Sequence, residues 1–256
     1  MEPPDLDVCK VLAIKHGLPL QFIINDAYLM EALSQIAAHQ EEIGAPVFKG
    51  GTALNKIHLG GMQRFSEDLD FDVEGDAKSA CMKAAAALSG FRIGEIRKVG
   101  KTWQFDCGFE SLLGKDNVRV DIARKPLIAS EGFANASVSS PFSQKSVAGV
   151  RAYSLNDLVA RKLFALESRA EGKDLYDAHS ALPLCKGMGN AIGKMLESEA
   201  KGSSVDEFLK HAVEKVRRTD PKKAGNLCNP FIPSKNRPKS WQILKNELAT
   251  MLFAIE

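Results

Sequence analysis

The pattern of hydrophobic and polar positions divides the chain into a part with both helices and strands, up to about residue 150, and a helical part after it. In the first part, apolar residues at helical spacing predict a helix over 25–42, capped by Asn25. Helices are also expected over 52–58 and 76–88, and strands over 46–48, from 68 onward, and over 91–99, 102–110 and 118–123. This order suits an α+β fold, a mixed sheet with helices packed on it.

The second part is predicted to be helical. Residues 125–149 are rich in Ser, Ala, Gly and Pro, which indicates a loop. Ser154 with Asp157 resembles an N-terminal cap and predicts a helix that reaches Arg169. Further helices are expected over 173–182, 190–200, 204–219 and 239–253, with a proline-containing connector over 220–237. We therefore expect a mixed-sheet core in 1–150 and a helical C-terminal domain in 151–256.

Composition excludes several classes of protein. No apolar run reaches the roughly 18 residues that a membrane span needs. The acidic, proline-containing N-terminus is unlike a secretory signal. The five cysteines are widely spaced and form no CxxC pair, which argues against structural zinc and a disulfide framework. We therefore expect a reduced, cytoplasmic protein. The net charge of +2 is uninformative, but basic residues cluster near the C-terminus, where they are typical of a solvated face or of a surface that guides a polyanion.

The most informative segment joins a glycine turn to a pair of acids. Gly50 and Gly51 have no side chains, so the backbone there can turn tightly and approach a ligand closely. Thr52 adds a hydroxyl where a helix begins, and the free N–H groups of a helix start attract phosphate. Asp68 and Asp70 follow in a strand, where alternation places both carboxylates on one face. Two adjacent carboxylates repel each other, and Mg²⁺ bound together with substrate phosphates relieves that repulsion.

This segment resembles the first motif of the nucleotidyltransferase superfamily, a Gly-Gly-Ser/Thr turn followed by an acid-x-acid strand. More narrowly, KGGTAL and RFSEDLDF resemble the AbiEii/AbiGii family of bacterial toxin–antitoxin systems, which includes the MenT-type toxins. A second block agrees, because that family carries a Lys on one helix and an (R/K)DLYD run on the next. Here these are Lys162 and the run from Lys173 to Asp177. Lys173 replaces the commoner Arg.

The resemblance implies a metal site. Asp68 and Asp70 would be catalytic and would hold two Mg²⁺ ions, which clamp the attacking and leaving oxygens. The superfamily usually takes a third carboxylate from a neighbouring strand, and Asp121 is favoured over its rival Asp106 because its VDI context resembles the family's strand better. Asp72 continues the same face, and we leave open whether it is only a strand-end acid.

The resemblance also assigns a nucleotide site. Gly50, Gly51 and Thr52 would bind the nucleotide, and Lys162 would contact the triphosphate as a compact positive charge. Asp177 would orient Lys162 or contact the nucleotide, unless it forms an ordinary salt bridge with Arg161 or Arg169. The C-terminal helices would then fold back and complete the cleft.

The resulting hypothesis is an Mg²⁺-dependent nucleotidyltransferase that moves a nucleoside monophosphate from an NTP to an acceptor. The resemblance suggests the 3′ end of tRNA or another RNA as acceptor, a role as a toxin that blocks growth or phage infection, and an antitoxin as protein partner. Two alternatives stay open at this point. One is a protein-modifying nucleotidyl or phosphoryl transferase of the same fold, and the other is a non-catalytic nucleotide-binding module.

Overall fold

The computed structural model describes residues 3–255, and these residues form one mixed sheet of eight strands. The order across the sheet is β3-β5-β6-β2-β1-β8-β7, with β4 also paired to β5. Two neighbouring pairs, β2 with β6 and β1 with β8, are parallel, and the other pairs are antiparallel. The strands are β1 (Val47–Lys49), β2 (Asp68–Val73), β3 (Arg92–Ile93), β4 (Arg97–Val99), β5 (Thr102–Ser111), β6 (Gly114–Arg124), β7 (Phe133–Ser139) and β8 (Ser146–Tyr153).

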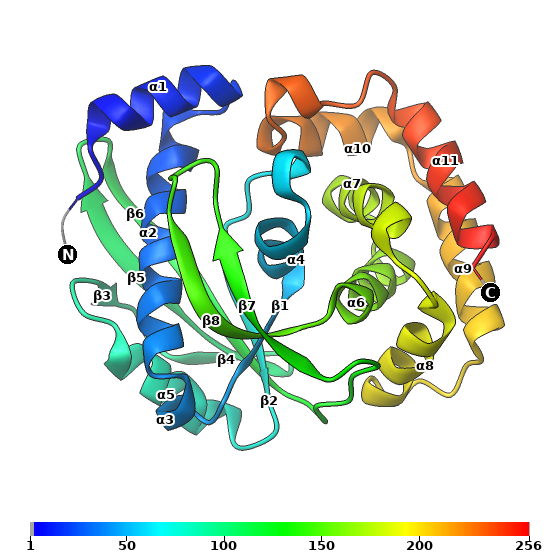
Figure 1. Ribbon diagram of the computed structural model, residues 1–256, viewed down its shortest axis with the longest axis horizontal. Helices are drawn as coiled ribbons and strands as arrows, with labels where there is room; N and C mark the ends of the chain where they lie inside the picture. The colour runs from blue at the N-terminus through cyan, green and yellow to red at the C-terminus, as the bar shows by residue number, and fades with distance from the viewer. Residues whose placement is uncertain (1–2, 256) are drawn as a thin grey trace.

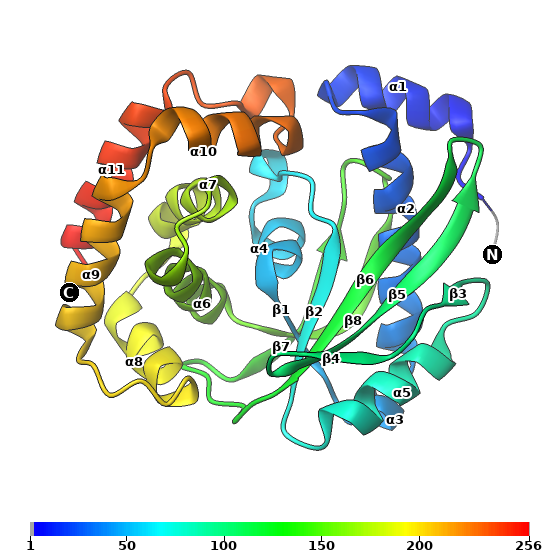
Figure 2. The same cartoon turned by 180° about the vertical axis from the view of Figure 1, so that it is seen from behind.

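Helices pack around this sheet, so the α+β prediction is confirmed. The first helices are α1 (Leu6–His16), α2 (Leu20–Ala38), α3 (Gln40–Ile43), α4 (Gly50–His58) and α5 (Ala77–Ala87). Helix α2 crosses β5 and β6, in front of them in Figure 1 and behind them in Figure 2. The later helices are α6 (Leu155–Ser168), α7 (Gly172–Ala181), α8 (Met188–Ser198), α9 (Val205–Arg218), α10 (Pro221–Cys228) and α11 (Trp241–Phe253).

Helices α6 to α11 gather on one side of the molecule, and α4 lies between them and the sheet (Figure 1). Helix α4 contacts β1 and β2 on one side and α6 and α7 on the other. The division of the chain at residue 150 stays a prediction, and the last strand of the sheet extends past it to Tyr153. None of the helices in residues 3–255 is long and apolar enough to cross a membrane.

Several helices begin with a side-chain cap formed by residues that are close in the sequence. The Asp76 side chain accepts hydrogen bonds from the first backbone N–H groups of α5. Ser154 accepts from the backbone N–H of Asp157 at the start of α6, as predicted. Helix α9 begins with a capping box between Ser204 and Glu207. Each cap satisfies N–H groups that a helix start leaves without an internal partner.

Other sequence predictions of local structure were wrong. Asn25 does not cap a helix, because the apolar run from Leu20 extends α2 backward and Asn25 lies buried in its second turn. The predicted loop 125–149 contains β7 and the first half of β8, whose small and polar residues obscure the strand pattern. The predicted strand 91–99 is two short strands, β3 and β4. The predicted connector 220–237 begins with α10, capped by Asp220 with Pro221 in its first turn, a favoured position for proline.

Candidate active site

The glycine turn connects β1 directly to α4. Gly50 has φ of +79°, which favours glycine, and a Cβ there would overlap the Asp70 carboxylate. Lys49 occupies the N-cap position of α4 and makes no side-chain hydrogen bond there, so no described side chain caps this helix. The first N–H groups of α4 therefore remain available to an anion beside the acid strand.

The paired acids lie on one face of β2. Asp68 and Asp70 point away from the buried side chains of Leu69 and Phe71, and Asp70 is in register with Asp121 on the parallel strand β6. Burial raises the pKa of Asp70 to about 6; Lys49 opposes this shift, while the negative charges of Asp121 and Asp68 add to it. Burial likewise raises the pKa of Asp121. Asp70 and Asp121 are therefore harder to ionise than free carboxyl groups, because they are buried and because other carboxylates lie near them.

Arg119 is a positively charged neighbour of these acids. Its Nη2 lies 2.8 Å from Asp68 Oδ2, and its Nε lies 3.4 Å from Asp121 Oδ2. Within residues 3–255, no three His, Cys, Asp or Glu side chains are grouped so as to hold a metal ion together. The donor chemistry nevertheless fits a hard divalent cation, since clustered carboxylate oxygens are the ligands that Mg²⁺ prefers. The guanidinium of Arg119 bridges two of the expected metal ligands.

The two remaining acids of this face have other partners. Asp106 lies one strand farther out, opposite Arg119, and pairs with Arg97 at 3.0 Å. Asp72 is buried between Lys49, at 2.5 Å, and the Tyr153 hydroxyl, which donates to it at 3.1 Å. Asp72 thus has the contacts of a structural ion pair. By position, Asp121 is nearer to the acid pair than Asp106, and its assignment as third metal ligand stays a prediction.

Lys162 faces the same space as the glycine turn. A cavity of about 220 Å³, here called the turn cavity, is lined by residues that include Lys49, Gly50, Gly51, Asp70, Arg161 and Lys162. Lys162 is 8% exposed, so its ammonium group is not a solvated surface charge. The structure therefore brings the second sequence block to the first, as the folded-back arrangement requires.

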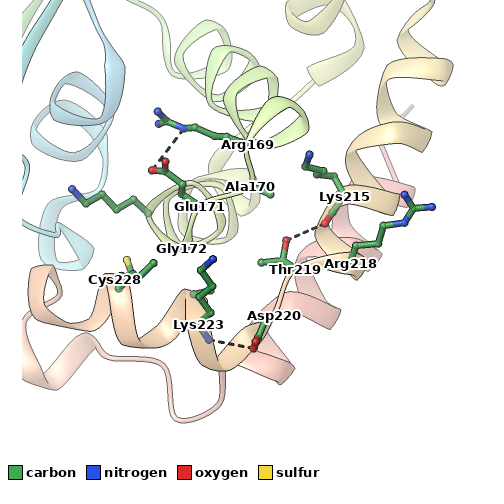
Figure 3. A pocket seen from close by; sticks show the side chains of 13 residues that line it. Arg169, Ala170, Glu171, Gly172, Lys215, Arg218, Thr219, Asp220, Lys223 and Cys228 are labelled. Atoms are coloured by element: carbon green, nitrogen blue, oxygen red, sulfur yellow. Dashed lines mark hydrogen bonds and ion pairs between the residues drawn. The ribbon is translucent and has the colours of Figure 1, made fainter.

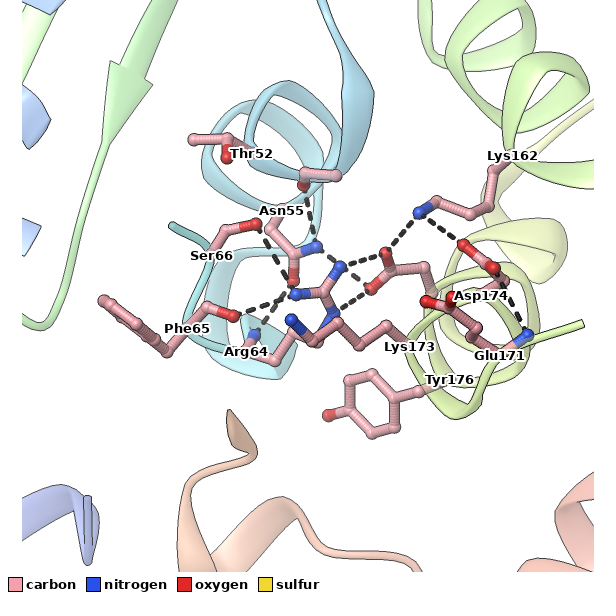
Figure 4. Close-up of polar contacts among 12 residues, drawn as sticks. Thr52, Asn55, Arg64, Phe65, Ser66, Lys162, Glu171, Lys173, Asp174 and Tyr176 are labelled. Carbon is pink, nitrogen blue, oxygen red and sulfur yellow. Dashed lines mark hydrogen bonds and ion pairs between the residues drawn. The ribbon is translucent and has the colours of Figure 1, made fainter. Parts of the chain in front are cut away.

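A buried polar network around Asp177 ties α7 to the turn. Figure 4 labels its members Asn55, Arg64, Lys162 and Asp174. The Asp177 carboxylate accepts hydrogen bonds from Arg64 Nε at 2.9 Å, Arg64 Nη2 at 2.7 Å and Asn55 Nδ2 at 3.0 Å. Lys162 Nζ lies 3.0 Å from Asp177 and 3.1 Å from Asp174. Burial alone would raise the pKa of Asp177, but the positive charges of Arg64 and Lys162 lower it to about 2. Neither alternative partner, Arg161 or Arg169, pairs with Asp177.

The sequence analysis assigned no role to two residues of this network, Asn55 and Arg64. It also assigned none to Lys49, which lies outside the network and pairs with Asp72. Asn55 lies one helical turn after Gly51, and its amide also donates to the Gly51 carbonyl at 2.9 Å. A Cβ on Gly51 would lie 2.7 Å from Arg64 Nη2, so this glycine makes room for the guanidinium. Asn55 Oδ1 also accepts a hydrogen bond from the backbone N–H of Arg64 at 2.9 Å. Both contacts join Arg64 to the glycine turn, and no local sequence pattern predicts either.

Two more residues near the turn have contacts that the sequence did not predict, Thr52 and Arg161. Thr52 is buried, and its hydroxyl donates to the Asp68 carbonyl at 2.5 Å, which fastens α4 to β2. Its predicted nucleotide contact stays a prediction. Arg161 stacks over the Tyr153 ring at 3.8 Å, and its buried Nη1 has no hydrogen-bond partner among residues 3–255. Its Nη2 donates to the Ile128 carbonyl at 3.1 Å. Arg161 lines the turn cavity, where sequence reasoning had considered it only as a partner of Asp177.

Comparisons with known proteins show the family of this chain. Residues 31–242 match the family model described as nucleotidyl transferase AbiEii toxin, type IV TA system. Comparison with curated proteins gave no match. Among solved structures, the MenT4 nucleotidyltransferase toxin of Mycobacterium tuberculosis H37Rv is similar, with a TM-score of 0.61 and 20% identity over 97% of this chain and 90% of that one.

Two Helicobacter pylori structures are also similar in fold. The protein JHP933 has a TM-score of 0.56 and 17% identity, covering 93% of each chain. A putative nucleotidyltransferase has a TM-score of 0.53 and 17% identity, covering 93% of this chain and 96% of that one. At such identities the likeness concerns the fold alone. The family match spans most of the chain, and the chain therefore belongs to the AbiEii family of nucleotidyltransferase toxins.

Proposed function

We propose that this enzyme is an Mg²⁺-dependent nucleotidyltransferase that moves a nucleoside monophosphate from an NTP to the 3′ end of an RNA, with tRNA as the first candidate. The observation that carries the proposal is the turn cavity, where the uncapped start of α4, Asp70 and Lys162 surround one space. Positioning and charge neutralisation are what phosphoryl transfer asks of a protein. These residues supply both.

In the proposed reaction, the triphosphate lies against the N–H groups at the start of α4, with Arg161 and Lys162 beside its oxygens. Asp68, Asp70 and Asp121 would hold Mg²⁺, which neutralises the developing charge on the transferred group. The acceptor hydroxyl oxygen forms a bond to the α-phosphorus, and the bond from that phosphorus to the bridging oxygen breaks. Pyrophosphate leaves, and the hydroxyl proton is lost to solvent.

A basic groove supports a polyanionic acceptor. It has a volume of about 630 Å³ and lies between the start of α7, the end of α9 and α10 (Figure 3). Its lining includes the basic residues Arg169, Lys173, Lys215, Arg218 and Lys223, against the acids Glu171 and Asp220. Arg169 also lines the turn cavity, so the groove adjoins the proposed nucleotide site. Positive grooves of this kind bind nucleic-acid backbones.

The biological role proposed here follows the family. Transfer to RNA by a toxin would block growth or phage infection, and an antitoxin partner would restrain it. We place the reaction in the cytoplasm because NTPs and RNA are found there.

The test is transfer of label from [α-³²P]NTP, with each of the four nucleotides, to total RNA and to total protein in separate reactions. The proposal expects label in RNA, dependence on Mg²⁺, and no label from [γ-³²P]NTP. Label in protein alone would establish the protein-modifying alternative. NTP binding without any transfer would establish a nucleotide-binding module.

A further inference from the structure

A row of polar side chains, here called the Gln104 row, crosses neighbouring strands of the sheet at the level of Asp70. Its members, each in register with the next, are Arg97 (β4), Gln104 (β5), Asp121 (β6), Asp70 (β2) and Lys49 (β1). Side chains of directly opposed residues lie on the same face of a sheet. Gln104 is the uncharged member of the row, and the nucleotide site described above gives it no role.

Gln104 joins Asp121 to Arg97 by hydrogen bonds at both ends of its amide. A guanidinium only donates and a carboxylate accepts, so the amide oxygen faces Arg97 and the amide NH₂ faces Asp121. In this orientation Gln104 Nε2 donates to Asp121 Oδ1 at 3.2 Å, and Gln104 Oε1 accepts from Arg97 Nη2 at 2.9 Å and Nε at 3.0 Å. The amide would lose these bonds if it turned over, so its orientation is fixed.

The two oxygens of Asp121 have different neighbours. Gln104 donates to Oδ1, whereas Arg119 Nε lies 3.4 Å from Oδ2. The same guanidinium lies 2.8 Å from Asp68 Oδ2 through its Nη2. One cation therefore contacts Asp68 and Asp121 Oδ2 together. The hydrogen bond to Oδ1 opposes rotation of the Asp121 carboxylate and so keeps Oδ2 on the side of Asp68.

Carboxylates that bind metals are themselves held by hydrogen bonds, and loss of these bonds weakens metal binding. We propose that Gln104 is a positioning residue of the metal site, which holds Asp121 with Oδ2 toward Asp68, and that Arg97 in turn holds Gln104. The inference rests on the proposed Mg²⁺-dependent transfer. It also gives Asp106 a place outside the ligand set, because its carboxylate pairs with Arg97 at the outer end of the row.

A purely structural role for Gln104 makes a different prediction. Polar pairs between neighbouring strands stabilise a sheet, and β5 and β6 pair along most of their length. If Gln104 only joins these strands, its loss lowers the stability of the protein and leaves the affinity for metal unchanged. If Gln104 positions Asp121, its loss lowers the affinity for metal.

The first experiment measures binding of Mn²⁺ to the full chain after removal of metal by EDTA, without NTP or RNA, from the EPR signal of the free ion. Gln104→Met keeps the length of the side chain and its lack of charge, and it removes the donor to Asp121. The Kd for Mn²⁺ is expected to rise about 10-fold, at the lower end of such effects because the row is partly exposed. An unchanged Kd overturns the inference.

Gln242→Met is the matched control for this measurement. It makes the same chemical change at an exposed position of α11, which lies on the opposite side of the molecule from β5 (Figure 1). The control is expected to keep the wild-type Kd. A rise in the control equal to that in Gln104→Met would show that the effect is not specific to the row, and it overturns the inference.

The second experiment follows nucleotidyl transfer as a function of Mg²⁺. In Gln104→Met the Mg²⁺ concentration for half-maximal activity is expected to rise by the same factor as the Kd for Mn²⁺. The kcat at saturating Mg²⁺ is expected to recover to within about twofold of the wild type, because excess metal fills a weakened site. A loss of kcat that Mg²⁺ does not restore overturns the inference.

Failure of the proposed function has a different signature from failure of this inference. A wild-type chain that binds no Mn²⁺ overturns the metal assignment of the proposed function, and the role of Gln104 with it. A wild-type chain that binds Mn²⁺, together with a Gln104→Met variant that binds it equally well, overturns the role of Gln104 alone.

Discussion

Two groups of carboxylates lie close to the glycine turn. The charges that surround one group are mainly negative, and those that surround the other are positive. Asp68, Asp70 and Asp121 on the sheet face one another, and the pKa values of Asp70 and Asp121 are raised. Asp174 and Asp177 on α7 face Arg64, Lys162 and Arg169, and their pKa values are lowered. The carboxylates on the sheet therefore have few positive charges around them, whereas those on α7 are paired with positive side chains.

This difference distinguishes residues that could take part in the reaction from residues that hold the site in place. An excess of buried negative charge lowers stability unless a cation joins it, so it points to a ligand. A network whose charges are paired is expected to hold the α7 helix against the turn and to fix Lys162 where it lines the turn cavity. We accordingly propose that Asp68 and Asp70 take part in the reaction and that Asp177 positions Lys162. The four variants and conditions below test this division, beginning with the largest expected effect.

Replacing one acid of the pair is expected to abolish activity without harming the fold. Asp70→Asn removes a proposed Mg²⁺ ligand and should lower kcat for nucleotidyl transfer by about 10³-fold or more. Its Tm without metal should be equal to or higher than that of the wild type, because a buried like-charge repulsion disappears. The assay is label transfer combined with thermal unfolding. Wild-type turnover in this variant would end the metal assignment.

Breaking the saturated network is expected to cost stability instead. Asp177→Asn leaves Arg64 and Lys162 with less negative charge in a buried site, which should lower the free energy of unfolding by about 3–5 kcal/mol. Denaturant titration measures the change. Asp206→Asn, in the first turn of α9 and outside the network, is the control and should have little effect. An Asp177→Asn protein as stable as the wild type would show that the network is not structural.

Acid should weaken the same network. The folded pKa of Asp177 is about 2, below its ordinary value of 3.8, so the unfolded chain binds this proton more readily. The stabilisation is complete above about pH 4 and is lost as the pH falls toward 2, by on the order of 2 kcal/mol. Unfolding free energies across this range, compared with those of Asp177→Asn, isolate the contribution. Parallel pH profiles for the two proteins would contradict the lowered pKa.

The smallest expected effect concerns Arg119. Its guanidinium bridges Asp68 and Asp121, so it should compete with the metal for both. Arg119→Gln is expected to lower the Mg²⁺ concentration for half-maximal activity by roughly 3- to 10-fold, since a neutral amide competes less than a cation. A higher Mg²⁺ requirement would show that Arg119 supports the metal or the substrate instead.

The sequence predicts those parts of the candidate site that depend on near neighbours in the chain. Gly50, Gly51, Asp68 and Asp70 lie within one turn and one strand, where alternation and glycine conformation are informative. Lys162 was assigned by family resemblance, and the structure places it in the turn cavity. Thr52 was expected at the nucleotide, yet its hydroxyl is engaged with β2.

What the sequence left hidden depends on contacts between distant segments. Arg64 and Asp177 are 113 positions apart, and no local pattern pairs them. Strand β7 pairs with β8, and β8 pairs with β1, which stabilises segments whose own composition resembles a loop. Asn25 resembled a helix cap because Asn is favoured at that position. The apolar residues before it are part of the same helix, which begins at Leu20.

The most direct test of the central claim is the effect of Mg²⁺ on thermal unfolding, measured for the wild type, Asp70→Asn and Asp177→Asn after removal of metal by EDTA. A ligand that binds only the folded state raises the Tm. The account predicts that saturating Mg²⁺ raises the Tm of the wild type and of Asp177→Asn, and leaves that of Asp70→Asn unchanged. An equal rise in Asp70→Asn would contradict it.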